Sequence, residues 1–123
     1  MNRDHILLVD DNYIINLELH EVLRDAGFTV ESVYSGATAI AALKCNPPWA
    51  LVTDVDLGSG PNGFAVARYA REVTPDMPVV FISGTMGGQH PSQGVPGSDF
   101  IAKPCRGLQV VEALLRATRL EAA

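Results

Sequence analysis

Short apolar runs alternate with longer amphipathic segments along this chain, and this alternation restricts the possible fold more than any other feature. Five runs are typical of buried strands, and they cover residues 5–10, 28–33, 49–55, 78–83 and 99–103. Segments with apolar residues at helical spacing cover residues 12–27, 35–45, 63–73 and 107–123. Strands separated by helices pack as right-handed βαβ units around a parallel sheet. The pattern therefore predicts a doubly wound, five-stranded α/β domain with helices on both faces.

Length and composition are those of one globular domain. The chain has 123 residues, of which 47% are hydrophobic and 19% charged, and its formal net charge is −5. Nucleic-acid surfaces need clustered basic residues, so this charge argues against such a partner. The first apolar run is too short for a signal peptide, and no run has the length of a membrane span. We expect a single cytoplasmic domain over residues 1–123, with no membrane contact and no attached output module.

Polar residues stand at the ends of four of the five predicted strands. They are Asp10 and Asp11 after the first strand, Asp54 and Asp56 after the third, Ser83 after the fourth and Lys103 after the fifth. The carboxyl ends of parallel strands meet at one edge of a sheet, so these side chains should converge. Carboxylates about 4 Å apart repel each other by roughly 4 kcal/mol at an effective dielectric near 20. The cluster therefore requires a cation or shared protons.

The residue types in this cluster indicate phosphoryl chemistry. Carboxylate oxygens without nearby His or Cys favour Mg²⁺. A site with Mg²⁺, one lysine and one hydroxyl can stabilise a transferring phosphoryl group, and an aspartate can accept that group as an acyl phosphate. An acid pair, a serine or a lysine at a single strand end is commonplace as a turn or loop residue. Their joint occurrence at several strand ends predicts a phosphoryl-transfer site.

The motifs ILLVDDN, LVTDVDLG and DFIAKP resemble the receiver domain of bacterial two-component response regulators, and the resemblance covers essentially the whole chain. It implies a flavodoxin-like sheet with strand order 2-1-3-4-5. It also implies that Asp54 is the phosphoacceptor. Mg²⁺ would be held by Asp11, Asp54 and the backbone carbonyl of Asp56, and Asp10 would contribute indirectly.

The same resemblance assigns roles outside the acidic cluster. Ser83 and Lys103 would bind the phosphoryl group, and Phe100 would be the aromatic side chain that switches on activation. Asp56 and Thr85 would tune the lifetime of the phosphoryl group. An acidic residue at position 56 is expected to change that lifetime, in a direction that the sequence leaves open.

Family membership would also define the partners. A sensor histidine kinase or a histidine phosphotransfer protein would donate the phosphoryl group to this phosphoprotein. The output would be contact with a downstream protein or phosphate buffering, and a dimer that forms on phosphorylation is compatible with both. The domain would catalyse only its own phosphorylation and dephosphorylation, so it is not expected to be a turnover enzyme.

Two stretches depart from the family pattern. Gly58 stands where a proline is usual. The segment GTMGGQHPSQGVPG, residues 84–97, lies where the family has its fourth helix. Each interior glycine costs a helix about 1 kcal/mol and each proline about 3 kcal/mol, so we expect this helix to be degenerate or replaced by a loop. The segment lacks the G-K-[ST] ending of a phosphate-binding loop.

Two other functions remain open at this point. A phosphatase or phosphotransferase of the haloacid-dehalogenase type also uses an aspartyl phosphate, and DVDLG resembles its D-x-D motif. In that superfamily, however, the nucleophile follows the first strand of the motif order, and the chain is usually longer. A nucleotide- or flavin-binding module of flavodoxin type has less support, because no glycine-rich loop follows the first strand.

Overall fold

Five parallel strands form one sheet in the order β2-β1-β3-β4-β5, as predicted. The structure is a computed structural model that describes residues 4–84, 94–103 and 107–122, and the side chains up to residue 117. The strands are β1 (His5–Val9), β2 (Thr29–Val33), β3 (Ala50–Asp54), β4 (Val79–Ser83) and β5 (Asp99–Ala102). β1 pairs with β3 in the register Val9↔Thr53, so the residues after Val9 and Thr53 lie next to each other at the carboxyl edge.

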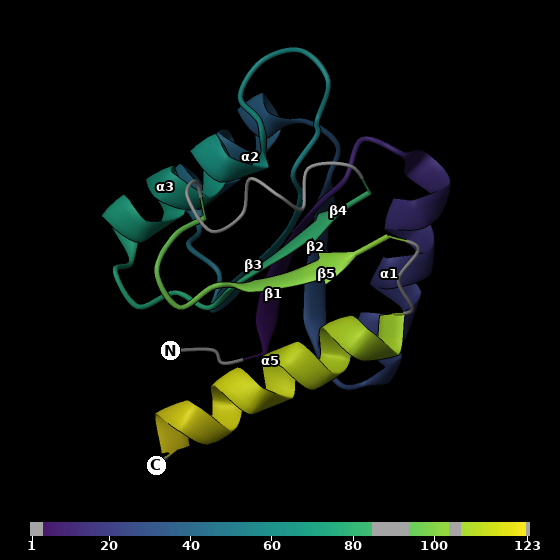
Figure 1. Cartoon of the computed structure of the whole chain (residues 1–123), viewed down its shortest axis with the longest axis vertical. Helices are drawn as coiled ribbons and strands as arrows, with labels where there is room; N and C mark the ends of the chain where they lie inside the picture. The colour runs from purple at the N-terminus through teal and green to yellow at the C-terminus, as the bar shows by residue number, and fades with distance from the viewer. Residues whose placement is uncertain (1–3, 85–93, 104–106, 123) are drawn as a thin grey trace.

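Helices cover both faces of the sheet (Figure 1). They are α1 (Tyr13–Asp25), α2 (Gly36–Cys45), α3 (Gly63–Val73) and α5 (Gly107–Ala122). α2 and α3 pack on one face, and α1 and α5 pack on the other. None of the described helices combines the length and the apolarity that crossing a membrane requires.

The central strands are mostly apolar because both of their faces are buried. Leu7 and Val9 of β1 belong to the core under α2 and α3, whereas Ile6 and Leu8 belong to the core under α1 and α5. Side chains alternate between the two faces of a strand, so a strand covered on both sides becomes a continuous apolar run. The first run can stop being apolar only where the sheet ends, which is at Asp10.

Side-chain caps begin the helices directly after the strands. Asn12 caps α1, and its side-chain oxygen accepts hydrogen bonds from the backbone N–H groups of Ile14 and Ile15 at 3.0 and 3.1 Å. Ser35 caps α2, as predicted, and forms a capping box with Thr38. Such caps satisfy amide groups that have no partner within the helix. At α1 the cap directly follows Asp10 and Asp11, so it fixes where the helix begins after the acid pair.

The segment between β4 and β5 is described only in part. Residues 94–98 form a turn rather than a helix, and Val95 is buried in the core under α2 and α3. Arg71 of α3 holds this turn, because its guanidinium donates to the carbonyl oxygens of Pro96 at 2.7 Å and Met77 at 2.8 Å. Residues 85–93 lie outside the described residues. For them, the replacement of the fourth helix stays a prediction.

Gly63 allows α3 to begin directly against the end of β3. A Cβ atom at this position would lie 2.2 Å from the carbonyl oxygen of Asp54 and 2.9 Å from the Cα of Val55. Both atoms belong to the backbone, so neither can rotate away. We predict that Gly63→Ala lowers the free energy of unfolding by about 1–3 kcal/mol, the usual range for overpacking. Urea denaturation measures this change.

The matched control is Arg68→Ala, on the exposed face of the same helix. Surface substitutions of this kind change stability by less than about 0.5 kcal/mol. Equal stability of the two variants would show that α3 can move away from Asp54 without cost.

Candidate functional site

Three carboxylates converge at the carboxyl edge of the sheet. Asp10, Asp11 and Asp54 each place one oxygen within 4.8 Å of the others. Asp10 is 1% and Asp54 is 5% exposed, whereas Asp11 is exposed. The predicted convergence is therefore confirmed for Asp10, Asp11 and Asp54, whereas the Asp56 carboxylate does not belong to this group. We refer to these three residues as the acidic cluster.

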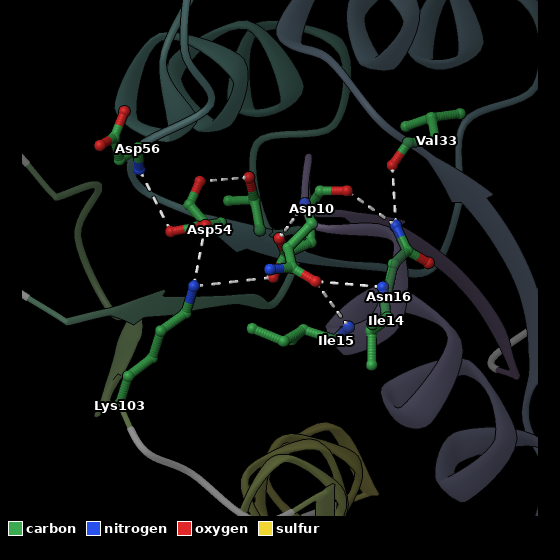
Figure 2. Close-up of polar contacts among 10 residues, drawn as sticks. Asp10, Ile14, Ile15, Asn16, Val33, Asp54, Asp56 and Lys103 are labelled. Carbon is green, nitrogen blue, oxygen red and sulfur yellow. Dashed lines mark hydrogen bonds and ion pairs between the residues drawn. The ribbon is translucent and has the colours of Figure 1, made fainter.

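Among the described residues, Lys103 brings a positive charge to the acidic cluster. Its ammonium nitrogen donates to Oδ2 of Asp54 at 3.0 Å and lies 3.8 Å from Oδ2 of Asp10. Figure 2 shows the lysine side chain reaching across to both carboxylates. The backbone N–H of Lys103 donates to the carbonyl oxygen of Ser83 at 2.8 Å, which holds the lysine beside the end of β4. The structure therefore places Lys103, which follows the fifth strand, beside the acids at the ends of the first and third strands, as predicted.

Burial dominates the ionisation of this site. It raises the pKa of the Asp54 carboxyl above its usual range, although the hydrogen bond and charge of Lys103 oppose this. Burial also raises the pKa of Asp10, against a hydrogen bond from the Asn12 backbone and with added repulsion from Asp54. Burial lowers the pKa of Lys103, but the hydrogen bond to Asp54 and the nearby carboxylate charges raise it by more. The net shift is upward, so the lysine stays protonated. One ammonium group does not compensate the acidic cluster.

The donor set fits a hard divalent cation. The cluster offers carboxylate oxygens only, which is the ligand type that Mg²⁺ prefers. Oδ2 of Asp10 is buried and has no hydrogen-bond partner within the described part of the chain. Buried polar atoms are normally paired. A cation held by Asp10, Asp11 and Asp54 would therefore compensate the excess negative charge and give this oxygen, which forms no hydrogen bond to a described residue, a ligand.

The loop after β3 borders the acidic cluster. The backbone N–H of Asp56 donates to Oδ1 of Asp54 at 3.2 Å, and the exposed Asp56 carboxylate accepts a hydrogen bond from the N–H of Gly58. Gly58 has φ +75°, and a Cβ atom there would lie 3.6 Å from Oδ2 of Asp11. Proline is locked near φ −65°, so it could not adopt this conformation. The loop path that Gly58 takes beside the cluster is therefore closed to the proline that the resemblance leads one to expect.

Ser83 ends β4, which pairs with β3, and Phe100 lies on β5, which pairs with β4. Ser83 is 4% exposed and ends β4, whereas Phe100 is partly buried and packs against the core under α2 and α3. Thr85 lies outside the described residues. The roles assigned to these residues in phosphoryl binding, switching and lifetime stay predictions, as do the metal-ligand and lifetime roles of Asp56.

Sequence reasoning missed one buried polar residue, Asn16. Together with Leu19 and Leu23 it forms the buried face of α1. A polar residue three positions before Leu19 and seven before Leu23 was a usable signal, because those spacings share one helix face. Asn16 donates to two backbone carbonyls at the carboxyl edge of the sheet.

Comparison with known proteins agrees with this geometry. The family model described as "Response regulator receiver domain" matches residues 6–115. A crystal structure of a response regulator receiver protein from Sinorhizobium medicae WSM419 is 42% identical, with a TM-score of 0.89 and coverage of 92% of both chains.

Two curated relatives are longer than this chain. The C4-dicarboxylate transport transcriptional regulatory protein DctD of Rhizobium meliloti is 29% identical, over 91% of this chain and 25% of its own length. The response regulator MprA of Mycobacterium ulcerans is 31% identical, over 94% of this chain and 52% of its own length. The chain thus spans about a quarter to a half of the length of these relatives.

The raised pKa of Asp54 has a testable consequence for stability. The folded protein binds this proton more tightly than the unfolded chain, so stability is lost as pH rises from the usual carboxyl pKa, about 4, through the folded value. Asp54→Asn removes this loss. We predict that, in EDTA, the variant is more stable than the unaltered protein at about pH 7, and that the difference shrinks towards about pH 4.

Urea denaturation across this pH range measures the difference, and added Mg²⁺ should reduce it because only the unaltered site keeps all three carboxylates. A variant that is less stable at neutral pH would show that the contact with Lys103 outweighs burial.

Proposed function

Because this chain belongs to the response regulator receiver family, we propose that it accepts a phosphoryl group on Asp54 in a Mg²⁺-dependent reaction. The observation that carries the proposal is the position of the Asp54 carboxylate. It lies 3.0 Å from the Lys103 ammonium and within 4.8 Å of the Asp10 and Asp11 carboxylates. A nucleophile, a fixed positive charge and a cation-binding donor set thus meet at one point.

The proposed reaction moves a phosphoryl group from the nitrogen of a phosphohistidine to Asp54. An Asp54 oxygen forms a bond to phosphorus while the phosphorus–nitrogen bond breaks, and the bonding electron pair leaves with the imidazole. Mg²⁺ held by Asp11, Asp54 and the backbone carbonyl of Asp56, with Asp10 contributing indirectly, would supply positive charge to the phosphoryl oxygens. Lys103 is already hydrogen-bonded to the acceptor, so its ammonium can pass to a phosphoryl oxygen without a large movement. The N–H of Asp56 holds Oδ1 of Asp54 and so orients the carboxylate.

The other assignments follow from the same proposal. Ser83 would bind the phosphoryl group with Lys103, Phe100 would report the switch, and Asp56 and Thr85 would tune the lifetime. A sensor histidine kinase or histidine phosphotransfer protein would act as donor in the cytoplasm. A downstream protein, with or without a phosphorylation-dependent dimer, would receive the signal.

The haloacid-dehalogenase alternative gains no support from Asp56. In that reading, the second acid of D-x-D would serve the chemistry at Asp54. Here the Asp56 carboxylate is exposed and accepts a hydrogen bond from Gly58 N–H at 3.2 Å within the loop. The two functions also differ in turnover, because a phosphatase hydrolyses small phosphate esters repeatedly whereas a receiver is labelled once.

We predict that acetyl phosphate and Mg²⁺ label the protein once per chain, and that Asp54→Asn or EDTA abolishes the label. Lys103→Ala should slow labelling by about 100-fold, the usual cost of removing one group that stabilises a transition-state oxyanion. Intact-mass spectrometry over time measures both effects. Lys44→Ala is the matched control, because Lys44 is the other lysine of the chain and lies over the Tyr69 ring on the α2–α3 surface.

Two results would contradict the proposal. Undiminished, acid-stable labelling of the Asp54→Asn variant would remove Asp54 as acceptor. Repeated hydrolysis of p-nitrophenyl phosphate by the unaltered protein, lost in Asp54→Asn, would instead favour the phosphatase.

A further inference from the structure

Asn16 links the end of β1 to the end of β2. Its side-chain amide donates to the carbonyl oxygen of Asp10 at 3.1 Å and to that of Val33 at 3.0 Å. Figure 2 shows the side chain between these two residues. The residue is 1% exposed and projects from the buried face of α1. A single neutral amide thus holds two backbone groups at the edge of the sheet that carries the acidic cluster.

The orientation of this amide follows from its partners. Both are carbonyl oxygens, which can only accept, so the NH₂ group must face them. Its own oxygen, Oδ1, is buried and has no hydrogen-bond partner among the described residues. A buried unpaired acceptor lowers stability. If residue 16 only filled space, an apolar residue of similar size, such as leucine, would therefore be more stabilising. The benefit of asparagine here must come from the two carbonyls that it holds.

One of those carbonyls is part of the backbone that joins the two acids. The Asp10 carbonyl belongs to the planar peptide unit that joins Asp10 to Asp11. The N–H of Asp10 also donates to Val33 at 3.3 Å, and the N–H of Asn12 donates to Oδ1 of Asp10 at 2.9 Å. The turn that carries both carboxylates is therefore hydrogen-bonded to β2, to α1 and within itself. Asn16 is the only side chain in this set that holds the peptide unit itself.

We propose that Asn16 is a positioning residue for divalent-cation binding at the acidic cluster. By holding the peptide unit between Asp10 and Asp11, it directs the Asp11 carboxylate towards the point that Asp10 and Asp54 also face. The proposal rests on the proposed function, since it takes the acidic cluster as the Mg²⁺ site. Asn16 itself contacts neither the cation nor the reacting atoms, so its effect passes through the Asp10–Asp11 backbone.

A purely structural role makes a different prediction. If Asn16 only joined α1 to the sheet, its loss would lower stability and leave the cation affinity of the folded protein unchanged. A positioning role requires the affinity itself to fall. Residues that orient metal ligands typically change metal affinity by 10- to 100-fold when replaced. Because Asn16 acts through the backbone, we expect the lower end of that range.

The test compares Mg²⁺ dissociation constants by two-dimensional NMR titration, with Mn²⁺ as a paramagnetic probe of the site. Asn16→Leu keeps a similar volume and removes both donors, and it should weaken Mg²⁺ binding by about tenfold. The amide signal of Asp11 should also shift in the metal-free variant. Leu23→Ala is the matched control, since it removes buried contacts from the same face of α1. It should lose stability and keep the dissociation constant.

Asn16→Ser keeps one donor in a smaller side chain, and it replaces Asn16→Leu in the titration if that variant does not fold. It should weaken binding by less than Asn16→Leu. An unchanged dissociation constant in a folded Asn16 variant overturns the positioning role while leaving the proposed function intact. If the unaltered protein binds no Mg²⁺, or if Asp11→Asn binds it equally well, the cation site of the proposed function fails and the role of Asn16 fails with it.

Discussion

In the part of the chain that the structure describes, the Lys103 ammonium faces more carboxylate charge than it can neutralise, and the rest of the site depends on this imbalance. Lys103 lies 3.0 Å from Asp54 and 3.8 Å from Asp10, and both carboxylates are almost completely buried. Burial raises the pKa of both acids in spite of the lysine. Such an arrangement costs stability unless further positive charge binds. A site of this kind is suited to taking up a cation and a phosphoryl group together.

The fold produces this imbalance by simple geometric means. Parallel strands bring their carboxyl ends to one edge, so residues far apart in the sequence become neighbours. The cap at Asn12, the close approach at Gly63 and the amide of Asn16 then hold the backbone around the acids. Each of these devices fixes backbone rather than side chains. The backbone that carries the carboxylates is therefore fixed before any ligand binds, which limits the reorganisation that the proposed phosphoryl transfer requires.

Much of this could be predicted from the sequence, for physical reasons. Strands buried on both faces are mostly apolar, so their ends are marked by charged or polar residues, here Asp10, Asp54 and Ser83. Asn16, Gly58 and Gly63 could not be interpreted in the same way. Their roles depend on which backbone atoms approach from other elements, such as Val33 for Asn16 and Asp54 for Gly63. Spacing along one helix or loop does not contain that information. The roles of Phe100 and Thr85 came from the resemblance alone and stay predictions.

The central claim is that burial leaves the acidic cluster electrostatically incomplete without a cation. The most direct measurement is the pKa of the Asp54 carboxyl group, followed by carboxyl ¹³C NMR in EDTA and again in Mg²⁺. We predict a pKa above the usual aspartate value of about 3.9 in EDTA and a marked decrease when Mg²⁺ is added. A pKa at or below the usual value in EDTA would contradict the claim. It would show that Lys103 alone balances the buried acids.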